Sequence, residues 1–251
     1  MPLKISLLAG EDLQAFLAEA VLSGYQDCIL VKPDENPDLI FCFLKNAIDA
    51  DFSNLCKQHG IKCIGVSKSF FRLQKSKFFA KMFSVNNGIL TPKLLSIECQ
   101  VYPQVVKLDD AETAGGVGVV NSDAEKKLFT TRFAGKKYFV EEYLTGENFS
   151  PVIYYSNGKV LYLSSIYDRY NEFTPQKQEK FQALLNKIEN ALKNEKADFS
   201  AVFSVKLIWC NNEYFLLGYN FVPDLMESEK YISVLKNELV TILRCEGLLK
   251  L

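Results

Sequence analysis

The sequence predicts an α/β protein of the α+β type, in which a small Rossmann-like unit precedes a larger antiparallel part. Three observations support this prediction. Apolar runs of strand length alternate with helical patterns over residues 1–67. Further along, hairpin signals such as Asn157-Gly158 separate the apolar runs. Of the 251 residues, 48% are hydrophobic and 24% are charged, which excludes disordered, collagen-like and coiled-coil classes.

Residues 1–67 are expected to form the Rossmann-like domain. One apolar face of helical period runs along Asp12–Leu22, and a second lies between residues 48 and 56. Strands that alternate with helices at this spacing indicate a parallel sheet with right-handed crossovers. The expected strands are the short apolar runs Cys28–Lys32, Asp38–Leu44 and Cys63–Val66.

Residues 68–251 are expected to form the second domain. A helix over residues 68–85 ends where Asn87-Gly88 and Thr91-Pro92 break the pattern. Pro175 begins another helix, because proline is favoured in the first turn. The other apolar runs predict strands at residues 105–107, 138–143, 151–155, 160–166, 201–210 and 213–220, and helices at 175–192 and 227–244.

The counts of charged residues, histidines and cysteines exclude some binding partners and some kinds of catalytic or metal site. The 29 Lys and Arg residues are balanced by 30 Asp and Glu residues, so no basic surplus favours a nucleic-acid partner. His59 is the single histidine, which excludes a multi-histidine metal site and leaves a catalytic thiol only one partner. The seven cysteines contain no CxxC pair, and we expect buried, reduced thiols.

The first ten residues contain one lysine and a short apolar run, and acidic residues follow. This pattern fits neither a secretory signal nor a membrane span. We therefore expect a cytoplasmic protein without a membrane partner.

A glycine-rich segment is the first candidate for chemistry. In residues 114–119, Gly115, Gly116 and Gly118 would let backbone N–H groups approach an anion. Lys107 lies eight residues upstream, at the end of an apolar run. A lysine on a strand that leads into such a loop is one way to hold nucleotide phosphates. A glycine-rich hairpin without a ligand is the alternative.

Two further motifs carry charge at the ends of predicted elements. Glu141-Glu142-Tyr143-Leu144 ends a strand and turns toward Glu147. Backbone groups at such a strand end can read an adenine edge, and a carboxylate can hold a ribose; a solvated strand end is the alternative. Lys77 follows Ser76 in a predicted helix, where a phosphate contact and an ordinary surface lysine are both open.

Taken in this order, the motifs resemble the ATP-grasp superfamily, and more narrowly the glycinamide ribonucleotide synthetases (phosphoribosylamine–glycine ligases). The resemblance runs from about Asp38 to the end of the chain. It implies an ATP-grasp fold, a pre-ATP-grasp domain at 1–67, an ATP-grasp domain at 68–251 and a lid subdomain at about 89–143. It also implies ATP or ADP as the ligand.

The resemblance assigns roles to the candidate residues. Lys77 and Lys107 would contact the nucleotide phosphates, together with the glycine-rich segment. Glu147 would face the ribose. The adenine pocket would be lined by Glu141, Glu142, Tyr143 and Leu144.

The sequence departs from that family where the metal belongs. In ATP-grasp ligases, two adjacent strands supply acidic ligands for Mg²⁺, the second ending in Glu-x-Asn. Here Asn220 stands in the place of the asparagine and Gly218 replaces the glutamate. Lys206 occupies a position that is acidic in many ATP-grasp relatives, though not in the glycinamide enzymes. Val222 replaces the usual arginine. A glycine offers no ligand and a lysine repels a divalent ion, so Mg²⁺ is doubtful.

The substrate side departs as well. Gly10 stands alone where the family has a glycine-rich turn for phosphoribosylamine. Residues 170–175 lead directly into a helix where a glycine-rich substrate loop should follow Tyr167-Asp168-Arg169. With 251 residues, we also expect the family's C-terminal domain to be absent. We therefore expect that this chain does not make glycinamide ribonucleotide.

Three functional hypotheses remain open, and no residue is singled out as catalytic. The first is a non-catalytic or regulatory nucleotide-binding protein with a protein partner. The second is an active ATP-dependent carboxylate–amine ligase that forms an acyl phosphate, with Asp224, Glu227 or Glu213 as substitute metal ligands. The third is an α/β protein that works through its surface alone.

Lys206 leads to a more specific hypothesis. Its ammonium group would occupy the space of the missing Mg²⁺ and pair with the nucleotide phosphates, which predicts nucleotide binding without Mg²⁺. The alternative is that Lys206 is a strand residue that points to solvent.

Overall fold

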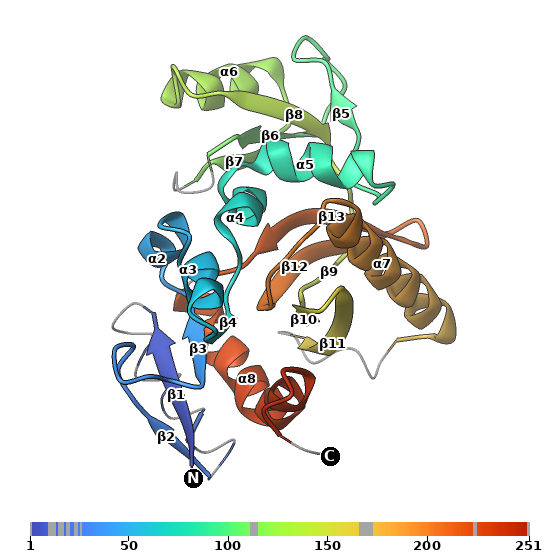
Figure 1. The fold of residues 1–251 in the computed structure, drawn as a ribbon. Coiled ribbons are helices and arrows are strands. Elements are labelled where there is room, and N and C mark those ends of the chain that lie inside the picture. Colours follow the sequence, from blue (N-terminus) through green and yellow to red (C-terminus); the bar gives the residue numbers. More distant parts are fainter. Residues whose placement is uncertain are drawn as a thin grey trace.

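The computed structural model describes residues 2–9, 27–110, 115–165, 173–222 and 225–249, together with five residues between 14 and 25. Most of the predicted helix at Asp12–Leu22 lies outside these residues, as do Gly10, the segment 167–169 and Asp224. Figure 1 shows three sheets: one at the N-terminal end, one in the middle of the molecule and one between residues 94 and 142, which we call the lid sheet after the predicted subdomain.

The N-terminal sheet is parallel, as the sequence predicts. Its strands are β1 (Leu3–Leu8), β2 (Cys28–Leu30), β3 (Leu39–Cys42) and β4 (Lys62–Ile64), in the order β2-β1-β3-β4. Two short helices, α2 (Lys45–Asp49) and α3 (Phe52–Gln58), connect β3 to β4. They are separate because Asp51 takes a left-handed conformation with φ of 58°.

The helix predicted over residues 68–85 is in fact two helices, α4 (Lys68–Lys75) and α5 (Lys77–Asn86). Ser76 between them is extended, and its hydroxyl accepts the Phe79 N–H at 2.9 Å as the cap of α5. Asp109 accepts hydrogen bonds from the Ser76 hydroxyl at 2.6 Å and the Phe78 N–H at 2.9 Å. Lys77 is therefore the first residue of a helix that a lid residue anchors.

The lid sheet is antiparallel and has the order β5-β8-β6-β7. Its small core consists of Val106, Val120 and Val140. Three elements of this region were not predicted from the sequence, namely β5, β7 and the helix α6. Their bounds are β5 (Leu94–Leu95), β6 (Gln104–Leu108), β7 (Val117–Val120), α6 (Asp123–Arg132) and β8 (Tyr138–Glu142).

The central sheet is antiparallel, in the order β11-β10-β12-β13, and β9 pairs with β12 beyond the end of β10. The turns at Asn157-Gly158 and Asn211-Asn212 have positive φ at both positions, as expected for two-residue hairpins. The strands are β9 (Glu147–Phe149), β10 (Pro151–Ser156), β11 (Lys159–Ser165), β12 (Ala201–Cys210) and β13 (Glu213–Asn220). Of these, only β9 was not predicted.

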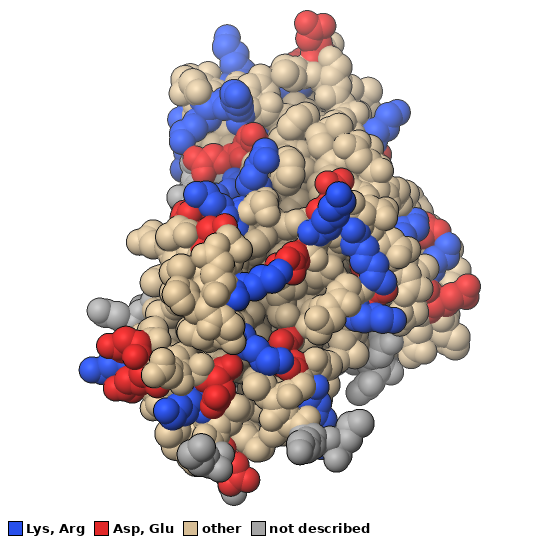
Figure 2. All heavy atoms as spheres, in the orientation of Figure 1, with Lys and Arg blue, Asp and Glu red and all other residues tan. Residues whose placement is uncertain are grey.

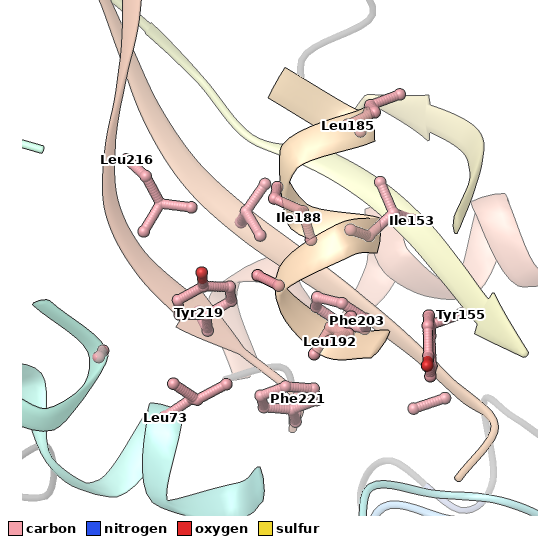
Figure 3. Close-up of a cluster of buried hydrophobic side chains, with 14 of the residues drawn as sticks. Leu73, Ile153, Tyr155, Leu185, Ile188, Leu192, Phe203, Leu216, Tyr219 and Phe221 are labelled. Atoms are coloured by element: carbon pink, nitrogen blue, oxygen red, sulfur yellow. The ribbon is translucent and has the colours of Figure 1, made fainter. Parts of the chain in front are cut away.

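Helices cover both faces of the central sheet. Ile153 and Tyr155 of β10 pack with helix α7 (Pro175–Asn194), as Figure 3 shows for part of this core. The alternating residues Val152 and Tyr154 pack instead against helix α8 (Leu225–Cys245) and the N-terminal sheet. Because successive strand residues face opposite sides, β10 is buried on both. Figure 2 shows basic and acidic side chains interspersed over the face drawn in Figure 1.

Candidate functional site

A cavity of about 680 Å³ lies where the lid sheet, helices α4 and α5, and the β12–β13 hairpin meet. It brings together most of the residues that the sequence singled out, although they are spread over more than 140 positions of the chain. The predicted residues that line it are Lys77, Lys107, Glu141, Glu142, Tyr143, Leu144, Lys206, Gly218 and Asn220.

Glu141 forms a buried double ion pair at the lid side of this cavity. Its carboxylate lies 2.6 Å from the ammonium nitrogen of Lys81 and 2.6 Å from that of Lys107. Only 2% of the Glu141 side chain is exposed. Lys81 also donates to the Pro92 carbonyl, where the chain enters the lid. The Glu141 side chain therefore holds Lys107 in place, and its carboxylate is not open to an adenine edge.

Glu142 is also held at the strand end. Its carboxylate accepts the Lys93 N–H at 2.7 Å, and its own N–H donates to the Lys93 carbonyl at 3.0 Å. Tyr143 and Leu144 follow at the cavity wall, outside any strand. Their backbone groups are thus the part of this motif best placed to meet a planar ligand.

Three lysines that the sequence predicted share the cavity with Lys45. The Lys77 ammonium, at the start of α5, donates to the Asp110 carbonyl at 2.8 Å. Burial lowers the pKa of Lys77, the charges of Asp109 and Asp110 oppose this, and the charges of Lys107 and Lys206 lower it further. The mutual repulsion of these ammonium groups would be relieved by a bound anion, which makes this part of the cavity suited to phosphate.

Strand pairing places Lys206 opposite Gly218. The two residues are partners in the β12–β13 ladder, so their side-chain directions lie on the same face of the sheet. Phe203 and Val205 of the same strand lie in the α7 core, whereas Lys206 and Ile208 line the cavity. Lys206 therefore faces the cavity and lies on the opposite side of the strand from the α7 core; its side chain is exposed, so a lysine that points to solvent stays the alternative to a phosphate contact.

A β-bulge brings Gly218 and Asn220 to the cavity. The ladder runs Lys206 to Gly218 and then Leu207 to Leu216, so Leu217 is an extra residue. Before the bulge, Leu216 faces the α7 core, and after it Tyr219 does so. Because a one-residue shift exchanges the two faces of a strand, the bulge turns Gly218 and Asn220 toward the cavity.

Glu147 does not reach the cavity, in contrast to the role that the resemblance assigns to it. Glu147 and Asn148 are neighbours in β9, so their side chains point to opposite faces. The Glu147 carboxylate binds the Lys177 ammonium on α7 at 2.6 Å. Asn148, paired with the cavity residue Ile208, lines the cavity in its place.

The glycine-rich segment is only partly a loop. Gly118 lies in β7, paired with Val106, and a Cβ atom there would approach the Phe129 ring to 2.7 Å. Close packing against α6 therefore accounts for Gly118. The Gly116 carbonyl accepts the Leu108 N–H at 2.7 Å, and Gly115 has φ of 68°. Residues 111–114 lie outside the described part, so a phosphate contact from Gly115 and Gly116 stays a prediction.

Four residues that line this cavity or hold its lining residues in place were not predicted from the sequence. Lys81 lies four residues after Lys77, a spacing that places both on one side of a helix. Lys45 follows the carboxyl end of the parallel strand β3, a common ligand-binding position. Gln74 accepts hydrogen bonds from the Phe221 and Val222 backbones and carries no such sequence signal. The fourth residue is Asn148.

Among the described residues, those on the β12–β13 side of the cavity do not fit a magnesium ion held by protein ligands. Asn220 offers an amide oxygen, but Gly218 offers none and Lys206 places a positive charge beside it. Glu213 lies at the other end of β13, where it binds Lys180. Asp224 and the Glu227 side chain lie outside the described residues. In the described part of the chain, no group of three His, Cys, Asp or Glu residues is placed to hold a metal ion.

Comparison with solved structures identifies the fold. The chain is similar to phosphoribosylamine–glycine ligase from Thermotoga maritima, with a TM-score of 0.76 and 17% identity over 98% of this chain and 76% of that one. It is also similar to D-alanine–D-alanine ligase from Bacillus anthracis, solved in complex with ATP. The TM-score is 0.63, and the identity is 16% over 98% of this chain and 99% of that one.

A third similar structure is a RimK domain ATP-grasp protein from Sphaerobacter thermophilus, with a TM-score of 0.62 and 14% identity over 94% of this chain and 99% of that one. The chain therefore has the ATP-grasp fold, as the sequence motifs predict. No protein-family model matches the sequence, and no curated protein matches it. Among the described helices, none is both long and apolar enough to cross a membrane.

Proposed function

We propose that this protein binds ATP or ADP in the 680 Å³ cavity and does not make glycinamide ribonucleotide. The observation that carries the proposal is the convergence of Lys77, Lys107 and Lys206 on one cavity of an ATP-grasp fold. On this proposal the protein is a non-catalytic or regulatory nucleotide-binding member of the superfamily. A cytoplasmic location and a protein partner remain predictions from the sequence.

The lining residues support one orientation of the nucleotide. The adenine would lie against the Tyr143 and Leu144 backbone, between apolar side chains such as Ile208. The phosphates would lie at Lys77 and Lys107, since an ammonium group binds phosphate as a point charge. Asn148 lies on the face of β9 opposite to that of Glu147 and lines the cavity, so its side chain would hydrogen-bond the ribose.

Lys206 is proposed to take over the charge of the absent metal. In ligases of this kind, Mg²⁺ neutralises the negative charge that collects on the transferred phosphoryl group. Here the residue opposite Lys206 is Gly218, and no atom lies within 4 Å of a Cβ atom built on it. The Lys206 ammonium is therefore proposed to reach the phosphates from the sheet side, where Gly218 leaves space.

Isothermal titration calorimetry tests this proposal directly. ATP and ADP are titrated into the purified protein with EDTA and, separately, with MgCl₂. We expect saturable binding with EDTA, and a loss of at least about tenfold in affinity for Lys206→Ala, which corresponds to about 1.4 kcal/mol. Lys180→Ala is the matched control, because Lys180 on α7 binds Glu213 of β13 and does not line the cavity.

Two other outcomes would decide between the remaining hypotheses. Binding that strictly requires Mg²⁺ would contradict the role of Lys206 and would favour an active ligase with substitute metal ligands. No binding of either nucleotide under both conditions would contradict the whole proposal and would favour a protein that works through its surface. Lys77→Ala and Lys107→Ala variants would then be expected to keep the function of the protein.

A further inference from the structure

Asp109 joins the lid sheet to the start of helix α5, which lies below that sheet in Figure 1. It follows the last residue of β6, and its N–H donates to the Lys137 carbonyl at 2.9 Å, which ties it to the lid. Its carboxylate oxygen Oδ1 accepts the Ser76 hydroxyl at 2.6 Å and the Phe78 N–H at 2.9 Å. The backbones of Ser76 and Asp110 also form an antiparallel bridge. We refer to the two hydrogen bonds of the Asp109 carboxylate as the lid contact.

The two residues that Asp109 binds are the neighbours of Lys77 in the chain. Lys77 is the first residue of α5, and the N–H groups of a first helical turn have no carbonyl partner within the helix. Asp109 supplies that partner to Phe78 from outside the helix, and its negative charge is favourable at a helix N-terminus. A residue of the lid therefore fixes the start of α5, and with it the backbone of Lys77.

The lid also holds the end of the Lys77 side chain. The ammonium group donates to the Asp110 carbonyl at 2.8 Å. An ammonium group has three donors, so this hydrogen bond is compatible with another to a phosphate in the cavity. Lys107, the second residue proposed to bind phosphate, lies two residues before Asp109 in β6. The lid contact thus brings a lysine of the lid and a lysine of α5 to the same cavity.

The lid contact and the Glu141 ion pairs lie toward opposite ends of the lid sheet. Leu108 pairs with Tyr138, the first residue of β8, so Asp109 follows the end of the β6–β8 pair that is remote from residues 141–142. The Glu141 ion pairs are buried, whereas Asp109 is only partly buried. Because contacts near solvent open at lower cost than buried ones, the Asp109 end of the lid is the end that detaches first.

We propose that Asp109 is a positioning residue of the nucleotide site and acts through Lys77. The lid contact fixes the start of α5 and keeps the Lys77 ammonium group near Lys107, where both meet the same phosphates. Without this contact, the lid detaches at that end, Lys77 leaves the phosphate position and the nucleotide dissociates faster. The inference rests on the proposed nucleotide binding, although Asp109 acts from outside the lining of the cavity.

Hydrogen exchange in the protein without nucleotide tests the lid contact itself. The Phe78 N–H lies in the first turn of α5, so its protection from exchange depends on Asp109. By NMR, this amide should exchange slowly in the wild type and in Asp109→Asn, which keeps an oxygen acceptor. In Asp109→Ala it should exchange at least about tenfold faster. A wild-type Phe78 amide that exchanges at the rate of an unstructured peptide would overturn the proposal.

Calorimetry with ATP in EDTA tests the effect on the nucleotide site. We expect Asp109→Ala to bind ATP at least about tenfold more weakly than the wild type, and Asp109→Asn to stay within about threefold. Rescue by asparagine would show that the hydrogen bonds, and not the charge, are required. Asp123→Ala is the matched control, because its carboxylate accepts the Tyr102 hydroxyl elsewhere in the lid, and it should bind as the wild type does.

A double-mutant cycle shows whether Asp109 acts through Lys77. In a Lys77→Ala background, Asp109→Ala should change the affinity by less than about twofold, because the residue that it positions is gone. Equal losses in both backgrounds would overturn the proposal, since a general defect of the fold weakens binding whether or not Lys77 is present. ATP binding that is equally tight in Asp109→Ala and Asp123→Ala would overturn this role alone. No ATP binding by the wild-type protein would contradict the proposed function, and this role with it.

Discussion

At the scale of single residues, the most consequential contact is the one that Glu141 makes with Lys81 and Lys107. Both ammonium groups lie 2.6 Å from one buried carboxylate. The low dielectric of the interior makes such a cluster costly to interrupt, because removal of one charge leaves its partners without compensation. Glu141 thus determines both the stability of the lid junction and the position of Lys107 at the cavity.

A Glu141→Gln variant should be destabilised by about 3–5 kcal/mol, because it leaves two buried ammonium groups without a counter-charge. Chemical denaturation followed by circular dichroism measures the change. Glu147→Gln is the matched control, since the Glu147–Lys177 pair is partly exposed, and we expect a change of about 0–1 kcal/mol there. Equal effects at the two positions would contradict this account of Glu141.

The pH dependence of nucleotide binding should report on Lys77. Burial lowers the pKa of its ammonium group below the ordinary value, and phosphate binding requires the charged form. The affinity for ATP should therefore be highest at neutral pH and fall as the pH rises through that lowered pKa. Titrations between pH 7 and pH 10 measure this. A Lys77→Arg variant, whose guanidinium stays charged, should lose less affinity over the same range.

Gly218 offers a test of the metal-free site. A Gly218→Glu variant would place a carboxylate opposite Lys206, where no atom lies within 4 Å of the new Cβ atom. We expect it to pair with Lys206, to weaken ATP binding in EDTA by at least about tenfold, and to make added Mg²⁺ favourable. Gly218→Ala, which fills the same space without charge, should bind as the wild type does. Calorimetry distinguishes the two variants.

At the scale of elements, the site depends on how closely β9 and the connecting residues 143–146 before it approach β12. A Cβ atom on Gly146 would lie 2.0 Å from the Trp209 carbonyl oxygen, which only glycine avoids. This close approach lets β9 pair with β12 and directs Asn148 to the cavity and Glu147 to α7. The direction of both side chains is therefore a property of the strand pair.

A Gly146→Ala variant should disrupt this pairing. We expect a loss of about 1–3 kcal/mol in the free energy of unfolding, as for other overpacked sites, together with weaker nucleotide binding. Gly218→Ala is again the control, because its new methyl group meets open space, and it should leave stability unchanged or slightly raised. Thermal and urea denaturation of both variants would show whether the close contact is responsible.

At the scale of the whole molecule, the proposed nucleotide cavity joins the lid sheet, the helices α4 and α5, and the central sheet. A ligand there contacts all three parts and should stabilise the native state as a unit. At one hundred times the dissociation constant, the expected gain is about 2.7 kcal/mol. A rise in the melting temperature with ATP and EDTA, absent for Lys77→Ala/Lys107→Ala, would be the corresponding observation.

Much of the fold follows from local sequence. The strands β12 and β13 have the predicted bounds, and their Asn-Asn turn has the expected positive φ values. The parallel N-terminal sheet follows from alternating strand and helix patterns. The helix α6 escaped prediction because the lid core is small, so this helix presents almost no apolar face; Lys126 is its one buried residue among those described.

The sequence by itself determined most of the elements, their order and three of the lysines that line the proposed nucleotide cavity, because periodicity and residue chemistry are local properties. Only the tertiary structure decided which way several of these residues face. The bulge at Leu217 and the directions of Glu147 and Asn148 both depend on pairing with distant strands. A register shift of one residue exchanges the faces of a strand, and the pairing partner sets that register.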